Sequence, residues 1–255
     1  AALRNAGYDI SSAPRSGYVL RSAPDRLIET EIRRNLDTRL IGQKIICYDA
    51  VDSTNLVLKD LARAGAEDGT VVVADSQGTG RGRMERAFFS PPGKGIWASI
   101  LLRPTFLPQD APKCTLMAAV AVARAMERFG LRAAIKWPND IMHDGRKLVG
   151  ILTEMSAEMD RVNYVVIGVG INVNIAPEDF PEELRTIATS LMQMKGEPLP
   201  RVVFLQELLR ALDELYADVQ SEGFAPVLAA WREYAVTLGQ TVRVIAPAGE
   251  EFEGV

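Results

Sequence analysis

Two long apolar segments, residues 147–156 and 161–172, are separated by only four residues, and this spacing constrains the fold more than any other feature of the chain. The short connection contains Glu158-Met159-Asp160 and predicts a hairpin, because parallel neighbours need a much longer crossover. The sequence therefore predicts that the two segments pair antiparallel. Further strands are expected at residues 44–48, 70–74, 96–102 and 133–137.

Segments with helical periodicity are interspersed irregularly among these strands. The longest is expected at residues 110–129, where Ala118, Val122, Ala125 and Phe129 recur on one face. Others are expected at residues 56–64, 201–221 and 224–234. Irregular alternation of helices with hairpins predicts an α+β fold, in which helices pack on a mixed or antiparallel central sheet, rather than a doubly wound parallel sheet.

Composition narrows the class of protein. The chain has 255 residues and 47% hydrophobic residues, which supports a substantial core. Its 29 basic and 33 acidic residues give a net charge of −4, so any contact with DNA is expected to be local. Cys47 and Cys114 are too few for a disulfide framework and favour a reducing cytoplasm. The longest apolar stretch, residues 114–123, is shorter than the roughly 20 residues of a bilayer span, so no membrane segment is expected.

An unusual loop lies at residues 80–97, where four glycines, three arginines and a lysine surround Phe88 and Phe89. Glycines allow backbone N–H groups to approach a ligand closely, and guanidinium groups pair with phosphate or carboxylate oxygens. An aromatic ring adds a flat face for a base. The loop predicts a nucleotide-type ligand, and the alternative is a basic loop that binds nucleic acid.

A second cluster lies at residues 134–141, where Pro138 and Asn139 predict a turn directly after an apolar strand. This arrangement places Lys136 at the end of the strand, beside Trp137. A lysine there can neutralise charge that develops on a phosphoryl or acyl oxygen during transfer of an activated acyl group. The alternative is an edge-strand lysine that keeps the sheet soluble.

Taken in order, the motifs of this chain resemble those of the biotin protein ligases, also called biotin–acetyl-CoA-carboxylase ligases. The resemblance covers about residues 45–245 and is more specific than any lone glycine motif. The matching motifs are Asp52-Ser53-Thr54-Asn55, Gln77 with Gly80-Arg81-Gly82-Arg83 and Ser90-Pro91, Lys136-Trp137-Pro138-Asn139-Asp140, Lys147-Leu148-Val149-Gly150-Ile151-Leu152, and Gly168-Val169-Gly170-Ile171-Asn172.

The resemblance implies an enzyme that works in two steps. The carboxylate of biotin attacks the α-phosphate of ATP, bound with Mg2+, to give biotinyl-5′-AMP and pyrophosphate. A lysine of a biotin carboxyl carrier protein then attacks the mixed anhydride and releases AMP. The family motifs make Lys136, Arg81 and Arg83 the expected catalytic residues. The residues expected to bind biotin or ATP are Ser53, Thr54, Asn55, Gln77, Gly80, Arg81, Gly82, Arg83, Phe88, Lys136, Asn139, Lys147, Gly150, Gly168, Gly170 and Asn172.

Some of these residues have simpler explanations. Ser53 or Thr54 can serve only as the N-cap of the following helix. The glycines at 168 and 170 can mark a bulge or a tight contact with a helix. Only the resemblance to the family, and not the local pattern, places these four residues at the ligand site.

On the nucleotide side, Phe88 stands where the family usually has tryptophan, which keeps a stacking face and removes the indole donor. Asp140 is either a ligand of the Mg2+ that accompanies ATP or a carboxylate that accepts backbone hydrogen bonds in a turn. His143 is the only histidine of the chain, so we expect no transition-metal site and no protein-bound metal.

The resemblance also implies a domain order. Residues 1–22 are expected to be the end of a winged helix-turn-helix, and residues 23–43 a linker helix capped by Asp25 or Thr30 and running through Leu36. Residues 44–237 are the ligase domain, of the class II biotin/lipoate type, and residues 238–255 begin a small SH3-like domain. A missing initiator methionine and a strand-like last segment predict that both ends are cut.

Three roles follow as expectations: modification of a carrier protein, binding of operator DNA as a biotin-responsive repressor, and homodimer formation. Two alternatives remain open. The first is a lipoate-type ligase with the same adenylation chemistry, which carries a different arginine- and glycine-rich loop. The second is a DNA-binding repressor that only senses biotin.

The loop generates a test. We expect Arg83→Gly to release biotinyl-5′-AMP, because the loop no longer shields the reactive anhydride from solvent. The variant should label lysines of an unrelated bystander protein as well as the carrier, as detected on a streptavidin blot. Labelling restricted to the carrier would contradict the shielding role.

Overall fold

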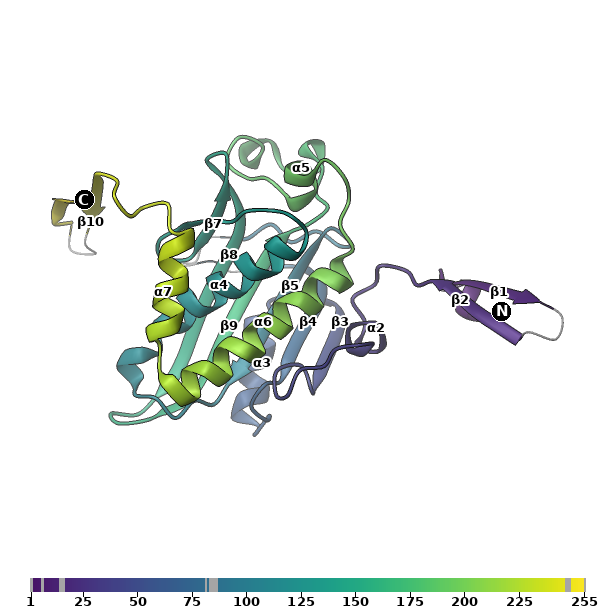
Figure 1. Ribbon diagram of the computed structural model, residues 1–255, viewed down its shortest axis with the longest axis horizontal. Coiled ribbons are helices and arrows are strands. Elements are labelled where there is room, and N and C mark those ends of the chain that lie inside the picture. The colour runs from purple at the N-terminus through teal and green to yellow at the C-terminus, as the bar shows by residue number, and fades with distance from the viewer. Residues whose placement is uncertain are drawn as a thin grey trace.

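The computed structural model describes residues 2–5, 7–13, 17–80, 82, 87–245 and 249–254. Its main body is a seven-stranded mixed sheet with helices on both faces (Figure 1), which confirms the α+β class. The spatial order of the strands is β3-β4-β5-β9-β8-β7-β6, and only β3 and β4 are parallel. The strands are β3 Ile45–Val51, β4 Val71–Gln77, β5 Gly95–Leu102, β6 Ala134–Lys136, β7 Asp140–His143, β8 Arg146–Ala157 and β9 Val162–Asn172.

The hairpin expected from the two long apolar segments is confirmed as β8 and β9. The Glu158 N–H donates to the carbonyl of Arg161 across the turn, at 2.9 Å. The two strands pair antiparallel from Val149 opposite Ile171 to Ala157 opposite Val162. This hairpin, with β5 on its other side, forms the centre of the sheet.

Apolar residues alternate between the two faces of the sheet, so each face buries its own core. Val71 and Val73 pack with α4, α6 and α7 on one face, whereas Val72 and Leu101 pack with α3 on the other. No helix in the described ranges is long and apolar enough to cross a bilayer. The main helices are α3 Thr54–Arg63, α4 Lys113–Arg128, α6 Arg201–Glu222 and α7 Ala225–Tyr234, and the short ones are α1 Ala2–Asn5, α2 Glu29–Arg33 and α5 Leu191–Lys195.

Helix α4 begins three residues later than the periodicity predicts. A short 3-10 turn, Pro108–Asp110, precedes it, and Pro112 occupies the N-cap position. Proline lacks the backbone N–H that a helix interior needs, so the helix starts after it.

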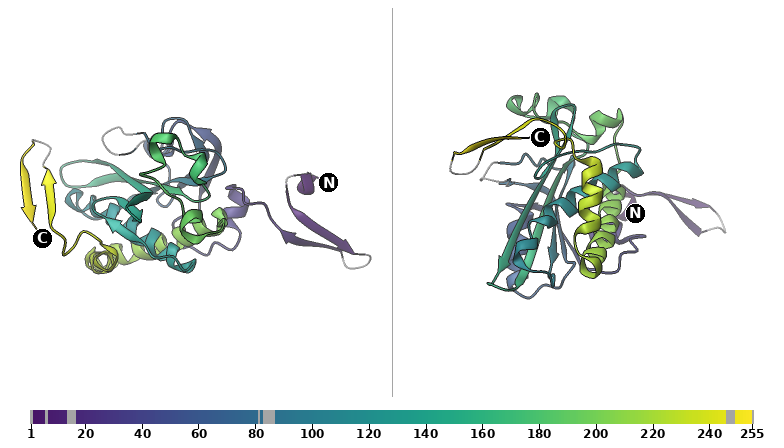
Figure 2. Two further views of the ribbon diagram at one scale, coloured as in Figure 1. Left: turned by 90° about the horizontal axis from the view of Figure 1, so that it is seen from above. Right: turned by 60° about the vertical axis from the view of Figure 1, so that its left-hand side comes forward.

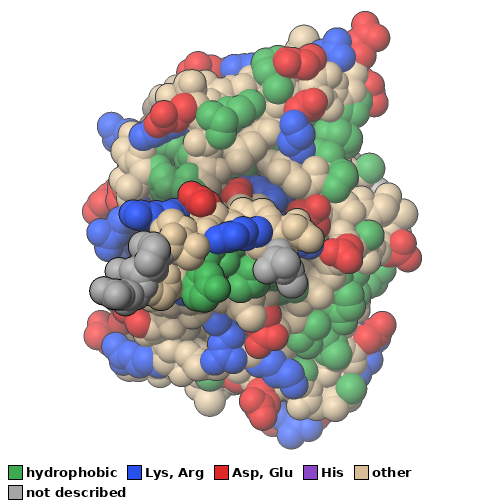
Figure 3. All heavy atoms as spheres, turned by 90° about the vertical axis from the view of Figure 1, so that its right-hand side faces the viewer, with side chains coloured by type: hydrophobic (Ala, Val, Ile, Leu, Met, Phe, Trp, Pro, Cys, Tyr) green, Lys and Arg blue, Asp and Glu red, His purple; other side chains and the backbone are tan. Residues whose placement is uncertain are grey.

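Hairpins extend from the main body at both ends of the chain (Figures 1 and 2). At one end β1 Asp9–Ala13 pairs with β2 Gly17–Ser22, directly after α1. At the other end β10 Val242–Ile245 pairs with β11 Glu251–Gly254. The side of the molecule from which the N-terminal hairpin extends carries intermingled acidic and basic side chains (Figure 3).

The expected linker helix is much shorter than predicted, and neither expected cap is used. Ile28 occupies the N-cap position of α2, which ends at Arg33 rather than at Leu36. Asp25 instead accepts hydrogen bonds from Arg201 Nε and from the Val202 N–H, at 3.2 and 3.0 Å. The linker is irregular because polar groups of α6, and not the linker's own helical turns, form hydrogen bonds with it.

Two further side chains of α6 hold this linker. The Gln206 amide donates to the carbonyls at 31, 32 and 34, at 2.7–3.2 Å. The Asp213 carboxylate accepts from the N–H groups of Arg39, Leu40 and Ile41, at 2.8, 2.9 and 2.7 Å. Asp213 is buried, so these three bonds replace water for both partners.

We expect Asp213→Asn to lower the free energy of unfolding by about 1–3 kcal/mol, because the amide has one acceptor oxygen and leaves a buried N–H unsatisfied. Urea unfolding followed by circular dichroism measures the change. Asp218→Asn, at an exposed position of the same helix, is the control and should stay within about 0.5 kcal/mol of the original protein. Equal effects of the two changes would contradict the role of Asp213.

Candidate active site

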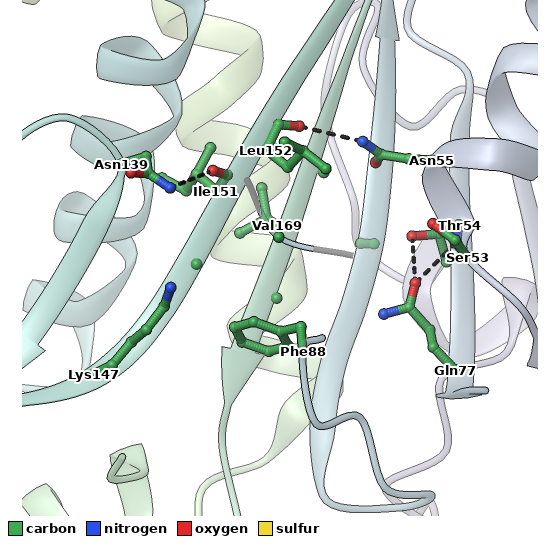
Figure 4. A pocket seen from close by; sticks show the side chains of 15 residues that line it. Ser53, Thr54, Asn55, Gln77, Phe88, Asn139, Lys147, Ile151, Leu152 and Val169 are labelled. Atoms are coloured by element: carbon green, nitrogen blue, oxygen red, sulfur yellow. Dashed lines mark hydrogen bonds between the residues drawn. The ribbon is translucent and has the colours of Figure 1, made fainter. Parts of the chain in front are cut away.

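Two adjoining pockets lie on the α3 side of the central strands, beyond the N-terminus of α3. Figure 4 shows the inner one. They share Gly82, Phe88, Asn139 and Lys147 and so form one continuous depression. The inner pocket is lined by Ser53, Thr54, Asn55, Gln77, Gly82, Phe88, Ala98, Asn139, Lys147, Gly150, Ile151, Leu152, Gly168, Val169 and Gly170. The outer pocket is lined by Gly82, Ala87, Phe88, Phe89, Asn139, Asp140, Lys147, Asn172, Phe180, Leu184, Ile187 and Ala188.

The floor of the inner pocket is made of backbone. Gly150 lies opposite Gly170 in the β8–β9 ladder, and Gly168 lies opposite Leu152 two residues further along. A Cβ atom at 150 or 170 would approach the Phe88 ring to 2.7 or 2.8 Å, closer than real Cβ contacts. A Cβ atom at 168 would overlap the Asn55 amide. The strands are regular at these positions, so the glycines mark close approach and not a bulge.

One end of the inner pocket is polar and closed. The Thr54 N–H donates to Gln77 Oε1 at 2.9 Å, and the Thr54 hydroxyl lies 3.2 Å from the same oxygen. Gln77 Nε2 donates to the Ser90 hydroxyl at 3.1 Å, and that hydroxyl donates to the carbonyl of Phe88 at 3.0 Å. These bonds tie the first turn of α3 to the end of β4 and to the loop that follows it.

Asn55 completes this polar end from below. Its amide Nδ2 donates to the carbonyl of Leu152 at 3.3 Å, and its Oδ1 accepts from the Ser99 hydroxyl at 2.6 Å. Ser53 occupies the N-cap position of α3, but its side chain makes no capping hydrogen bond. Simple N-capping therefore does not explain Ser53, which is buried against the pocket instead.

The opposite end of the depression carries an ion pair. The Lys147 ammonium lies 5.6 Å from the centroid of the Phe88 ring and 2.8 Å from Asp140 Oδ1. Both charged side chains remain about one third exposed, at 34% and 29%. Asn139, next to them, donates from Nδ2 to the carbonyl of Ile151 at 3.0 Å. The ion pair faces the outer pocket, where it can meet a charged ligand.

The remaining expected residues differ in whether they line the inner pocket, the outer pocket or neither. Lys136 ends β6 and is exposed, and it lines neither pocket, although it is the register partner of Asp140 in the β6–β7 hairpin. Gly80 packs under the pocket wall, where its carbonyl accepts the Phe88 N–H at 2.7 Å. Asn172 lines only the outer pocket. Arg81 and Arg83 lie outside the described residues, and Gly82 between them lines both pockets.

Several residues of the site carry no motif that points to them. Ser99 is one of them, and it completes the hydrogen bonds of the polar end together with Ser90 of the Ser90-Pro91 motif. The apolar wall of the outer pocket comes from residues 180–188, which belong to no long element. Only the alternation on β5 could have placed Ser99 on the site face, two residues from Trp97.

The site contains no activated thiol and no group of metal ligands. Cys47 and Cys114 are free, and burial raises their pKa to about 11 and about 12, so both thiols are protonated at neutral pH. Among the described residues no cluster of three or more His, Cys, Asp or Glu side chains could hold a metal ion. The hydrogen-bonding groups of the polar end and the ammonium of Lys147 support binding and charge stabilisation.

The chain is similar to known proteins in both sequence and fold. Residues 48–172 match the model of the Biotin/lipoate A/B protein ligase family. Over 242 residues the chain is 47% identical to the bifunctional ligase/repressor BirA of Bacillus subtilis, covering 94% of this chain and 74% of the relative. It is 32% identical over 243 residues to the biotin–[acetyl-CoA-carboxylase] ligase of Mycobacterium tuberculosis, covering 91% and 87%. The biotin protein ligase of Aquifex aeolicus, in complex with biotin and ATP, superposes with a TM-score of 0.72 at 28% identity, covering 83% of this chain and 86% of that one.

The backbone floor of the inner pocket leads to a prediction that can be tested without a ligand. We expect Gly168→Ala to lower the free energy of unfolding by about 1–3 kcal/mol, because the new methyl group displaces the Asn55 amide from its hydrogen bonds. Gly78→Ala is the control, since a Cβ atom there would meet Asp52 Oδ1 at an ordinary 3.6 Å. Urea unfolding of the two variants measures the difference, and equal stabilities would show that the floor has room.

Proposed function

The chain belongs to the biotin/lipoate A/B protein ligase family, and from the geometry of its site we propose that it is a biotin protein ligase that activates biotin with ATP and transfers it to a protein lysine. The observation that carries this proposal is the form of the depression. A polar end and a glycine floor, over which the Phe88 ring lies, lead to a mouth that holds the Lys147–Asp140 ion pair.

The polar end distinguishes biotin from lipoate. Gln77 and Thr54 present hydrogen-bonding groups within a buried pocket end, and a ureido ring offers N–H donors and a carbonyl acceptor to match them. A dithiolane ring offers neither, so it would leave these groups desolvated and unpaired. We propose that the valeryl chain runs close to the strand backbone at Gly150 and Gly170, in the place over these glycines that the Phe88 ring occupies in this structure.

The lysines at and beside the mouth of the depression suit the reacting atoms. In the first step a carboxylate oxygen of biotin bonds to the α-phosphorus of ATP, and the bond to the departing pyrophosphate breaks. Lys147 lies at the junction of the two pockets, where it neutralises negative charge, and Lys136 stands one hairpin pair from the outer pocket through Asp140. Arg81 and Arg83 flank Gly82, and we propose that they cover the adenylate.

The second step needs a nucleophile that this chain does not supply. The amine of an acceptor lysine attacks the acyl carbon, and AMP leaves with the bonding electron pair. We propose that the acceptor belongs to a biotin carboxyl carrier protein and that Phe88 faces the adenine of the adenylate. The Mg2+ that accompanies ATP would meet oxygen ligands, and Asp140 on the wall of the outer pocket is the candidate.

A second function concerns DNA. The relative in Bacillus subtilis is a ligase and a repressor. In this chain α1 and the β1–β2 hairpin stand apart from the ligase body, as a recognition helix and its wing would (Figure 2). We propose that residues 1–22 belong to a winged helix-turn-helix that contacts operator DNA, that residues 23–43 link it to the ligase domain of residues 44–237, and that residues 238–255 begin an SH3-like domain. Assembly as a homodimer in the cytoplasm is part of the same proposal.

The catalytic assay is direct. Labelled biotin should appear on the lysine of a carrier domain only when ATP and Mg2+ are present. We expect Lys136→Gln to slow adenylate formation about 100-fold, because charge stabilisation at the phosphate is lost, while the Kd for biotin changes little. Pyrophosphate release and calorimetry measure the two quantities.

The exposed Lys44, at the far edge of the sheet, provides the matched control as Lys44→Gln. Its rate should equal that of the original protein. Transfer without ATP, or transfer of lipoate in preference to biotin, would contradict the proposed function.

A further inference from the structure

We propose that Phe88 competes with biotin for the floor of the inner pocket, so that its ring must leave the floor before biotin can reach from the polar end to Lys147. This role is separate from the contact with adenine that is proposed above. The inference rests on the proposed function, because biotin is the ligand that displaces the ring. It makes Phe88 the residue that limits how fast this ligand enters the site.

The inner pocket is too small for biotin while the ring is in place. Its cavity volume is about 40 Å³, whereas that of the outer pocket is about 510 Å³. A single buried water needs roughly 10–15 Å³ of such volume, so the inner pocket has room for about three waters. Sites for small organic ligands typically measure about 300–1,000 Å³. A bicyclic ring with a valeryl chain therefore does not fit this conformation of the pocket.

The Phe88 ring takes up the space that the ligand needs. It lies so close to the floor that a Cβ atom at Gly150 would meet its Cε2 atom at 2.7 Å, and one at Gly170 its Cε1 atom at 2.8 Å. Figure 4 shows the ring between Gln77 on one side and Lys147 on the other. A chain that connects these two sides has to cross the same glycines. The ring and the valeryl chain therefore exclude each other.

The ring and the ligand also compete for Lys147. In this structure the Lys147 ammonium lies 5.6 Å from the centroid of the ring, within the range of a cation–π contact. The proposed function brings the carboxylate of biotin and the α-phosphate of ATP toward the same ammonium. An anionic oxygen binds an ammonium more strongly than an aromatic face does, so the arriving ligand replaces the contact that it breaks.

Hydrogen bonds hold the backbone of Phe88 but not its side chain. The Phe88 N–H donates to the carbonyl of Gly80 at 2.7 Å, and the Phe88 carbonyl accepts from the Ser90 hydroxyl at 3.0 Å. The ring itself is held by packing, including an edge-on contact with Trp97 in which the ring centroids are 5.9 Å apart. Rotation of the side chain can therefore clear the floor while residue 88 keeps both backbone hydrogen bonds.

The outer pocket offers a place for the displaced ring. Phe88 lines this pocket as well as the inner one, and Phe180, Leu184 and Ala188 give the outer pocket an apolar lining. The ring thus exchanges one apolar environment for another, which costs less free energy than exposure of the ring to water. This low cost is what allows a ligand to displace a competing side chain.

Competition of this kind acts on the association rate. Biotin binds only to those molecules in which the ring has left the floor, so the observed association rate constant is the intrinsic one multiplied by the fraction of such molecules. Contacts between the displaced ring and a bound ligand act on the dissociation rate instead. Separate measurement of the two rates therefore distinguishes the competing role of Phe88 from an ordinary contact with the ligand.

The first test removes the ring. In Phe88→Ala we expect the association rate constant for biotin to rise about 10-fold, which corresponds to an open fraction of about 10% in the original protein. KM for ATP should rise in the same variant, because the face proposed for adenine is lost. Rapid filtration with radiolabelled biotin measures the association rate, and pyrophosphate release measures KM.

Phe89→Ala is the matched control. Phe89 is the neighbouring aromatic residue, it lines the outer pocket and not the inner one, and it packs against Phe180 with the ring centroids 6.1 Å apart. Its association rate constant for biotin should stay within about 2-fold of the original, because the fraction of open molecules is unchanged. A rate constant that does not rise in Phe88→Ala, or that rises equally in both variants, overturns the competition.

A second measurement keeps the side chain. A para-fluorophenylalanine placed at position 88 alone reports the surroundings of the ring by fluorine NMR. We expect saturating biotin to shift its resonance, because the ring moves away from the edge of Trp97. A resonance that stays in place while calorimetry shows that biotin is bound also overturns the proposal. If the original protein binds no biotin, the proposed function itself fails, and the two failures are thereby distinguished.

Discussion

The register between β8 and β9 is the constraint on which the site depends. It sets Gly150 opposite Gly170 and Leu152 opposite Gly168, and β5 adds Trp97 and Ser99 beside the same two rows. Side chains alternate along a strand. A slip of one residue would therefore turn the side chains of Val169 and Ile151, which pack in the core on the α4 face, toward the pocket and would turn the glycines toward that core. The apolar residues that pack against α4 hold this register, and the core thereby keeps the pocket floor bare.

Local features of the sequence predicted much of this arrangement. The hairpin follows from two adjacent apolar segments, and α3, α4, α6 and α7 follow from their periodicity. The glycine motifs and the Ser-Thr-Asn turn identified most of the inner pocket, because each comes with its own strand or helix terminus. Features that depend on contacts distant in sequence were not predictable in this way. Nothing near residues 180–188 indicates that they wall the outer pocket, and nothing near residue 25 indicates that Asp25 binds Arg201 rather than capping a helix.

Contacts distant in sequence also decide where Lys136 and Lys147 lie relative to the pockets. Lys136 ends one strand-like segment and Lys147 begins another. The sequence gives Lys136 the stronger motif, yet Lys147 is the one of the two that lines both pockets. The difference arises in the turns of the β6–β7–β8 meander, including the shift in register between Ile141 and Met142. Such a shift changes which side chains face the pocket and leaves no mark in the hydrophobic pattern. Lys136 keeps its proposed catalytic role because it is the register partner of Asp140. Lys147 is proposed for a catalytic role as well, because it lines both pockets.

Helix α6 connects the pocket to the N-terminal segment by a short path. Arg201 is buried and donates to Asp25 in the linker and to Asp75 on β4, at 3.2 and 3.1 Å. Asp75 is two residues before Gln77, and its carbonyl accepts the Trp97 indole N–H at 3.1 Å. One guanidinium therefore spans the linker and the strand that delivers Gln77 to the polar end. A buried cation with two acidic partners has few alternative arrangements, because displacing either carboxylate leaves charge without its partner. The linker and the pocket wall are thus held in one geometry, which is the condition for the ligand site to influence the proposed DNA-binding segment, residues 1–22, through the covalent chain.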